Sequence, residues 1–292
     1  MAMARTYASA GAFRKALEER LKSESRARQM DVNRLRRQVS FDRLLARLFR
    51  TDAVPWVLKG GYALELRFKA ARSTIDIDLT LQRVVGALDN DSTVQVVREM
   101  LQAAAAVSLD DWFEYTIGPP ILDLTAAPYG GARYSVETRM DGRIFAKFHL
   151  DAGIGDVVIQ PLETIECSDW LSFAGIQQPK VRVISREQQF AEKIHAYTLP
   201  RNSPNSRVKD LVDLMLLSRD SQVDKPRVLN ALRETFERRN THTLPTSLIA
   251  PPEEWQIPFD ALAAECGLQI SLLKAFEGLC KFFREVLAAA EK

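Results

Sequence analysis

The chain has 292 residues, of which 46% are hydrophobic and 27% are charged, a composition typical of a globular protein with a sizeable core. No apolar run approaches the roughly 18 to 20 residues that span a membrane, and the first residues lack the apolar segment and cleavage site of a secretory signal. The three cysteines are widely separated and odd in number, which is typical of buried thiols in a reducing cytoplasm, and the three histidines are equally dispersed. We therefore expect a cytoplasmic protein without a membrane segment, a disulfide framework or a zinc site.

The positive charge of the chain is concentrated at its N-terminus. Residues 1–50 contain 13 Lys and Arg against 5 Asp and Glu, a net charge of +8, so the other residues carry −6 of the total of +2. A basic region suits a polyanionic partner, because each phosphate contact releases counterions. A solvated helix surface would have the same composition, and charge alone leaves both interpretations open.

Apolar periodicity predicts helices in the first fifty residues, where Phe13, Leu17 and Leu21 recur every four positions. A β-rich pattern with turn signals follows, and a helical pattern begins again at Ser185. Between these points we expect, in chain order, a strand at 56–58, a helix at 61–68, a strand at 75–80, a helix at 92–106, a hairpin of strands at 134–140 and 143–150 around Asp141-Gly142, and a strand at 181–184.

These elements predict an α+β fold in three parts. A basic helical N-terminal region occupies residues 1–50, a mixed α/β core occupies 51–182, and a helical C-terminal domain occupies 183–292. The boundary between the last two parts is expected near 180–185, where the β pattern gives way to the helical one.

Two aspartates are expected on one face of the strand at 75–80. Ile75, Ile77 and Leu79 alternate with Asp76 and Asp78, so the strand buries its apolar residues and presents two carboxylates side by side. Like charges at that separation repel each other unless a cation lies between them. The pattern therefore predicts a site for Mg²⁺, which prefers oxygen ligands.

A third carboxylate is expected from the neighbouring hairpin. The even-numbered residues from Ile144 to Leu150 are apolar and are expected to face the core, which places Asp151 on the other face with Lys147 and His149. Three carboxylates on adjacent strands are typical of phosphoryl or nucleotidyl transfer with two metal ions about 3.5–4 Å apart.

A glycine pair, Gly60-Gly61, lies between the first predicted strand and the helix that follows it. Glycines at this position let backbone N–H groups approach a triphosphate closely. Either signal is weak alone, but fourteen residues separate Gly61 from Asp76, and the two together in this order form a specific pattern.

Two later helices carry further charged residues. Phe190, Ile194 and Tyr197 are expected to be buried, which leaves the ammonium of Lys193 free to meet a triphosphate. On the next helix the leucines 211, 214 and 217 are expected to face the core. Asp210 and Asp213, at i and i+3, then share one side, where they either reach the site or pair with arginines.

The segment 57–80 resembles the first motif of the polymerase-β-type nucleotidyltransferase superfamily, and within it the AbiEii/AbiGii toxin family, which includes the MenT toxins. The resemblance rests on Lys59-Gly60-Gly61, then Arg72, then Asp76-Ile-Asp78. The wider superfamily has Gly-Ser where this chain has Gly-Gly, a form common in the toxin family. The resemblance extends over about residues 35–220 and includes Phe190-Ala-Glu-Lys193 and Arg207-Val-Lys-Asp-Leu-Val-Asp-Leu214.

The resemblance implies a polymerase-β-type mixed sheet with flanking helices and a helical C-terminal domain. It implies that Asp76, Asp78 and Asp151 bind Mg²⁺, two ions in all, and act in catalysis together with Lys193. The implied activity is transfer of a nucleoside monophosphate from an NTP to an RNA acceptor, the 3′ end of tRNA, by a toxin that inhibits translation and growth and is neutralised by a cognate antitoxin. The implied nucleotide-binding residues are Lys59, Gly60, Gly61, Arg72, Lys193 and Asp210.

Two other functions are consistent with the same sequence features. A small-molecule nucleotidyltransferase of the antibiotic-modifying kind would share the metal site, would need no basic arm and would be expected to have an acidic acceptor pocket. A nucleic-acid-binding or antitoxin-binding module with an inactive site is the second, and the intact Asp76, Asp78 and Lys193 count against it. A P-loop enzyme is excluded, because the chain has no Gly-x-x-x-x-Gly-Lys-Ser/Thr motif.

Overall fold

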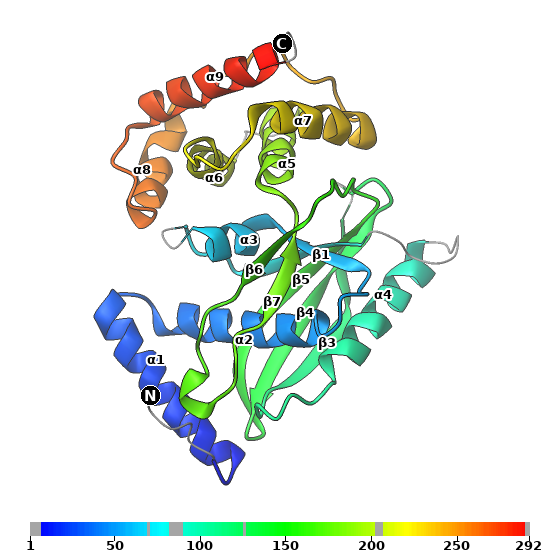
Figure 1. The fold of residues 1–292 in the computed structure, drawn as a ribbon, viewed down its shortest axis with the longest axis vertical. Helices are drawn as coiled ribbons and strands as arrows, with labels where there is room; N and C mark the ends of the chain where they lie inside the picture. Colours follow the sequence, from blue (N-terminus) through cyan, green and yellow to red (C-terminus); the bar gives the residue numbers. More distant parts are fainter. Residues whose placement is uncertain (1–6, 69–70, 82–89, 125–126, 202–206, 290–292) are drawn as a thin grey trace. The chain divides into compact units, whose positions relative to one another are not determined.

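A computed structural model describes residues 7–68, 71–81, 90–124, 127–201 and 207–289 (Figure 1). The chain forms two compact units. The first comprises Met1–Tyr62, Ser73–Gly155 and Thr164–Val183, and the second comprises Ala63–Arg72, Asp156–Glu163 and Ile184–Lys292. The first unit thus takes in the basic N-terminal region and most of the α/β core, whereas two short segments of the predicted core, 63–72 and 156–163, lie with the C-terminal helices.

The first unit is built on a seven-stranded mixed sheet with the order β3-β4-β5-β2-β1-β7-β6. The pairs β1/β2, β3/β4 and β4/β5 are antiparallel, and the pairs β2/β5 and β1/β7 are parallel. The predicted mixed sheet is therefore confirmed. The strands are β1 (Trp56–Lys59), β2 (Asp76–Leu81), β3 (Glu114–Asp123), β4 (Gly131–Met140), β5 (Arg143–Ile154), β6 (Glu163–Glu166) and β7 (Lys180–Val183).

The edge strand β3 and the short β6 are absent from the sequence prediction. β3 contains Gly118-Pro119-Pro120, which argues against a strand because proline cannot donate to a sheet ladder. The structure tolerates the prolines because β3 pairs with β4 alone, at the edge of the sheet, and its register shifts on either side of Pro120.

Helices α1 (Ala10–Arg28), α2 (Val32–Leu48) and α4 (Asn90–Ala105) accompany this sheet, as predicted. Ser9 caps α1 and Asp31 caps α2, each by accepting hydrogen bonds from the first backbone N–H groups of its helix. α2 is buried along most of its length and packs on β5 and β7, while α4 packs on β3 and β4 (Figure 1). The short helix α3 (Gly60–Arg67) begins in the first unit and ends in the second.

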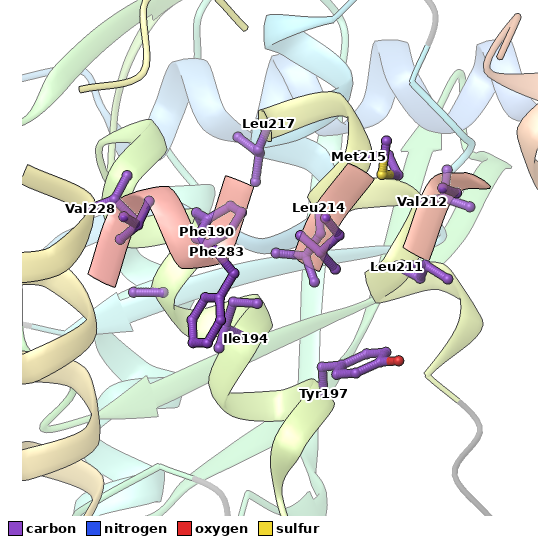
Figure 2. Packing of buried hydrophobic residues seen from close by; sticks show 14 of the residues in the cluster. Phe190, Ile194, Tyr197, Leu211, Val212, Leu214, Met215, Leu217, Val228 and Phe283 are labelled. Carbon is purple, nitrogen blue, oxygen red and sulfur yellow. The ribbon is translucent and has the colours of Figure 1, made fainter. Parts of the chain in front are cut away.

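The second unit is helical, as predicted from residue 185 onward. Its helices are α5 (Arg186–Thr198), α6 (Val208–Ser218), α7 (Lys225–Arg239), α8 (Gln256–Glu265) and α9 (Leu272–Ala288), with a short 3₁₀ turn at Glu253–Trp255. A similar 3₁₀ turn in the first unit spans Ser172–Ala174. Figure 2 shows the core of this unit, in which Phe190 and Ile194 of α5 and Leu214 of α6 pack with Phe283 of α9. These side chains are at most 1% exposed, so apolar burial holds α5 and α6 in fixed positions.

No helix in the described ranges is long and apolar enough to cross a membrane. The cysteines are free thiols; Cys167 and Cys266 are buried as expected, but Cys280 is only half-buried.

Candidate active site

The sheet of the first unit brings the three predicted aspartates onto one face. Asp78 on β2 lies opposite Asp151 on the parallel strand β5, and Asp76 lies two residues before it on the same face. On the far side of β2, Lys59 of β1 is the partner of Asp78, and on the far side of β5, Arg133 of β4 is the partner of Asp151. Four neighbouring strands, β1, β2, β5 and β4, thus present a cation, two anions and a second cation, in that order.

Two corrections to the predicted strand faces follow from the structure. Ile77 and Leu79 are buried as expected, but Ile75 precedes β2 and is 57% exposed. On β5 a bulge leaves Phe145 without a partner between the pairs Thr138/Ala146 and Arg139/Ile144, so Phe145 is buried and Ile144 is 45% exposed. Beyond the bulge the predicted alternation holds, and Asp151 faces the site.

The glycine pair encloses Asp78. Gly60 adopts a left-handed backbone with φ of 68°, and a Cβ atom at this position would lie 2.0 Å from Oδ2 of Asp78. The N–H of Gly61 points at the same oxygen, at 3.4 Å. These glycines therefore place the positive end of α3 against the carboxylate of Asp78, in addition to their predicted role toward a triphosphate.

The start of α3 is anchored by a buried carboxylate in α2. The hydroxyl of Tyr62, which follows the glycine pair, donates to Oδ1 of Asp42. Oδ2 of Asp42 accepts from the backbone N–H of Ser168 at 3.1 Å and from Nε1 of Trp170 at 2.9 Å. Complete burial raises the pKa of Asp42 to about 7, against the effect of these hydrogen bonds.

Asp76 has a buried oxygen that no described residue satisfies. Oδ1 accepts no hydrogen bond, although Nδ1 of His149 lies 3.3 Å away, and Nη2 of Arg133 lies 3.4 Å from Oδ2. A buried charged oxygen without a partner costs more than the roughly 1–3 kcal/mol of a neutral group, so this atom favours a cation.

This donor set fits a divalent metal ion. Within the described ranges no three His, Cys, Asp or Glu side chains form a metal-holding group. Mg²⁺ is usually bound by one or two carboxylates together with substrate phosphates and water, rather than by an all-protein cage. The orphaned oxygen of Asp76 and the neighbouring Asp78 therefore fit Mg²⁺ in the presence of a nucleotide.

Arg133 is a site residue that sequence analysis missed. Its Nε and Nη2 donate to the two oxygens of Asp151 at 2.7 and 2.8 Å, and these hydrogen bonds raise the pKa of Arg133. Counting strand residues back from the turn at Asp141-Gly142 pairs Arg133 with Leu150, on the buried face. The bulge shifts the register by one residue and pairs it with Asp151 instead.

The second unit contains a separate cluster of predicted site residues. Nζ of Lys193 lies 2.7 Å from Oδ1 of Asp210 and 2.8 Å from Oδ2 of Asp213. Arg72 donates to both oxygens of Asp213, at 2.9 and 2.7 Å. The prediction of a free lysine ammonium is therefore wrong. Arg207 completes the cluster, 3.5 Å from Asp210.

Burial and neighbouring opposite charges shift the pKa values of Lys193 and Asp213 in opposite senses. The Lys193 side chain is 15% exposed and that of Asp213 is 2% exposed. Burial lowers the pKa of Lys193, but the carboxylates of Asp210 and Asp213 outweigh burial and hold it above its usual value. Burial acts to raise the pKa of Asp213, and the charges of Lys193 and Arg72 bring it below its usual value. Lys193 and Asp213 therefore remain charged near neutral pH.

Several arginines of the basic N-terminal region form ion pairs within the fold. Arg36 donates to both carboxylate oxygens of Glu18, and Arg43 and Arg47 bind the buried Asp111. Other arginines of this region are exposed, among them Arg26 and Arg28.

The chain matches over residues 43–286 the protein family described as "Nucleotidyl transferase AbiEii toxin, Type IV TA system". Its structure is similar to that of MenT4, a nucleotidyltransferase toxin from Mycobacterium tuberculosis H37Rv, with a TM-score of 0.57 and 15% identity over 94% of this chain and 98% of that chain. A further solved structure, JHP933 from Helicobacter pylori, gives a TM-score of 0.47 and 14% identity over 88% of this chain and 93% of that chain. No curated protein matches the chain.

Proposed function

Because the chain belongs to the AbiEii nucleotidyltransferase toxin family of type IV toxin–antitoxin systems, we propose that it transfers a nucleoside monophosphate from an NTP to RNA, at the 3′ end of tRNA. The observation that carries this proposal is the orphaned buried oxygen of Asp76 beside Asp78, which itself lies against the glycine pair. A site of this composition suits a metal-bound triphosphate.

Asp76 and Asp78 would hold Mg²⁺, which when bound neutralises phosphate charge and acidifies an acceptor hydroxyl. The backbone N–H groups at the start of α3 favour phosphate oxygens because they are the positive end of a helix. In the second unit, Asp210 and Asp213 orient Lys193, and the phosphate-binding role that the sequence predicts for Lys193 is part of this proposal. We propose two Mg²⁺ ions at the site of Asp76 and Asp78, the number expected from the sequence.

In the proposed reaction the oxygen of the acceptor hydroxyl forms a bond to the α-phosphorus, and the bond from that phosphorus to pyrophosphate breaks. The hydroxyl proton leaves to water. Nucleotides added to a tRNA 3′ end block aminoacylation, so the expected consequence is inhibition of translation and growth in the cytoplasm. A cognate antitoxin would relieve it.

The test is incubation of the protein with each labelled NTP, Mg²⁺ and total RNA. Asp76→Ala and Asp78→Ala are expected to reduce labelling of tRNA about a hundredfold or more, because metal-ion catalysis contributes several kcal/mol. Asp123→Ala is the control, since Asp123 is an exposed aspartate at the end of the edge strand β3. Wild-type labelling by either active-site variant with a normal melting curve would refute the assignment.

The alternative of a small-molecule nucleotidyltransferase called for an acidic acceptor pocket. A cavity of about 590 Å³ in the first unit is lined by Asp110, Glu114 and Asp141. It lies at the opposite end of β5 from Asp151, and the nine residue-to-residue steps from Gly142 to Asp151 span about 30 Å. That distance is too great for an acceptor held there to reach the aspartates. Label on a small molecule alone would nonetheless select this alternative, and absence of any transfer would favour an inactive binding module.

A further inference from the structure

The three aspartates of the site differ in what they already bind. Arg133 engages both oxygens of Asp151 in a two-pronged arrangement, at 2.7 and 2.8 Å, a geometry that gives a strong charge-assisted pair. The side chains of this pair are only 14% and 29% exposed, so water screens them weakly. Asp76, in contrast, keeps a buried oxygen that accepts no hydrogen bond.

A metal ion bound by Asp151 would have to displace or share this guanidinium. Arg133 already supplies the positive charge that a metal ion would bring to Asp151, and breaking a shielded pair by moving one partner is strongly unfavourable. Both oxygens of Asp151 thus accept strong hydrogen bonds from the chain itself, whereas Asp76 accepts only a long one at Oδ2 and none at Oδ1.

Arg133 also retains donors for a ligand. Nε and Nη2 of Arg133 donate hydrogen bonds to Asp151 and Asp76, whereas Nη1 forms none with the described part of the chain. Because Nη2 also lies 3.4 Å from Oδ2 of Asp76, the guanidinium reaches the place where the proposed metal–nucleotide complex is held. Guanidinium groups bind phosphate well because their donors match the spacing of phosphate oxygens.

We propose that Arg133 binds a phosphate oxygen of the nucleotide, and that Asp151 positions Arg133 and is not a metal ligand. This inference rests on the proposed function. Arg133 stays protonated throughout, so it stabilises charge on the phosphates as the bond to pyrophosphate breaks, and transfers no proton.

The test separates metal binding from nucleotide binding in the full-length protein. Mn²⁺ affinity is measured by electron paramagnetic resonance without nucleotide, and the affinity for a non-hydrolysable α,β-methylene NTP is measured calorimetrically. Asp151→Asn is expected to leave Mn²⁺ affinity within about twofold of wild type, whereas Asp78→Asn should lower it about tenfold or more.

Nucleotide affinity should respond in the opposite way. Arg133→Gln and Asp151→Asn are expected to weaken binding of the NTP analogue about ten- to a hundredfold, the loss of one charge-assisted hydrogen bond. Arg133→Lys, which keeps the charge, should recover part of that loss. Arg139→Gln is the matched control, because Arg139 lies on the same strand and pairs with Glu137 on the surface.

Two results would overturn the proposal. One is a fall in Mn²⁺ affinity in Asp151→Asn as large as that in Asp78→Asn, which would make Asp151 a metal ligand. The other is wild-type affinity for the NTP analogue in folded Arg133→Gln or, if that variant does not fold, in folded Arg133→Ala. Neither measurement needs an acceptor, so failure to label RNA would count against the proposed function without deciding the role of Arg133.

Discussion

Replacing Gly60 with alanine tests whether the glycine pair positions Asp78. Alanine at a φ of 68° costs about 1–2 kcal/mol of left-handed strain. The added Cβ would also lie 2.0 Å from Oδ2 and 2.4 Å from Cγ of Asp78, well inside van der Waals contact. Asp78 cannot retreat, because β2 is paired on both sides, with β1 and β5. Its carboxylate must therefore rotate away, and we expect transfer to fall by on the order of a hundredfold.

Gly142→Ala is the matched control. Gly142 has a φ of 66°, and a Cβ atom there meets nothing within 4 Å, so this variant has the strain without the overlap. At about 2–4 °C per kcal/mol, the strain alone lowers the melting temperature by roughly 2–8 °C in both variants. Gly142→Ala should keep wild-type transfer. If Gly60→Ala melts no lower than the control and labels RNA at the wild-type rate, the reasoning about Asp78 fails.

Three further variants test other parts of the structure. Lys193→Ala removes the cation that Asp210 and Asp213 share, although Arg207 and Arg72 still pair with them, and should cost about 1–3 kcal/mol of stability and weaken NTP binding. The exposed Lys209→Ala should change neither, and equal urea midpoints for the two variants would contradict this. The pKa of Asp42 is raised to about 7, whereas an aspartate in the unfolded chain ionises near 3.9. Between about pH 4 and 7 the folded state therefore keeps a proton that the unfolded state loses, and the free energy of unfolding falls as pH rises through that window. Urea titrations of Asp42→Asn should lack this component, and an unchanged pH dependence would argue against it. Replacing the exposed Arg26 and Arg28 with Glu should weaken RNA binding without changing NTP affinity. The slope of log RNA affinity against log salt concentration should fall by about one for each lost phosphate contact, and a slope equal to that of wild type would mean that these arginines only form a solvated surface.

The sequence by itself determined the features that depend on local periodicity. Alternation along a strand has a period of two whatever the strand pairs with, so Asp76 and Asp78 share a face wherever β2 lies in the sheet. The helical repeat likewise places Phe190 and Ile194 in a core, and both are completely buried. The glycine pair could be recognised for the same reason, because its place between a strand and a helix is set by neighbouring residues.

Tertiary structure alone decided which charges meet. Lys193 is separated by more than a hundred residues from Arg72, and nothing in the spacing of these residues indicates whether its ammonium is free or paired with Asp210 and Asp213. Such pairing depends on how helices pack, which local patterns do not specify.

The placement of Arg133 opposite Asp151 depended on a single bulged residue, Phe145. One extra residue in β5 shifts the register of the hairpin and moves every later pair by one position, and a shift of one position exchanges the two faces of a strand. Turn chemistry and alternation predict the hairpin but carry no signal for the bulge. The bulged Phe145 is buried and packs against Phe113, a residue far from it in the chain, and a contact of this kind is not specified by local patterns.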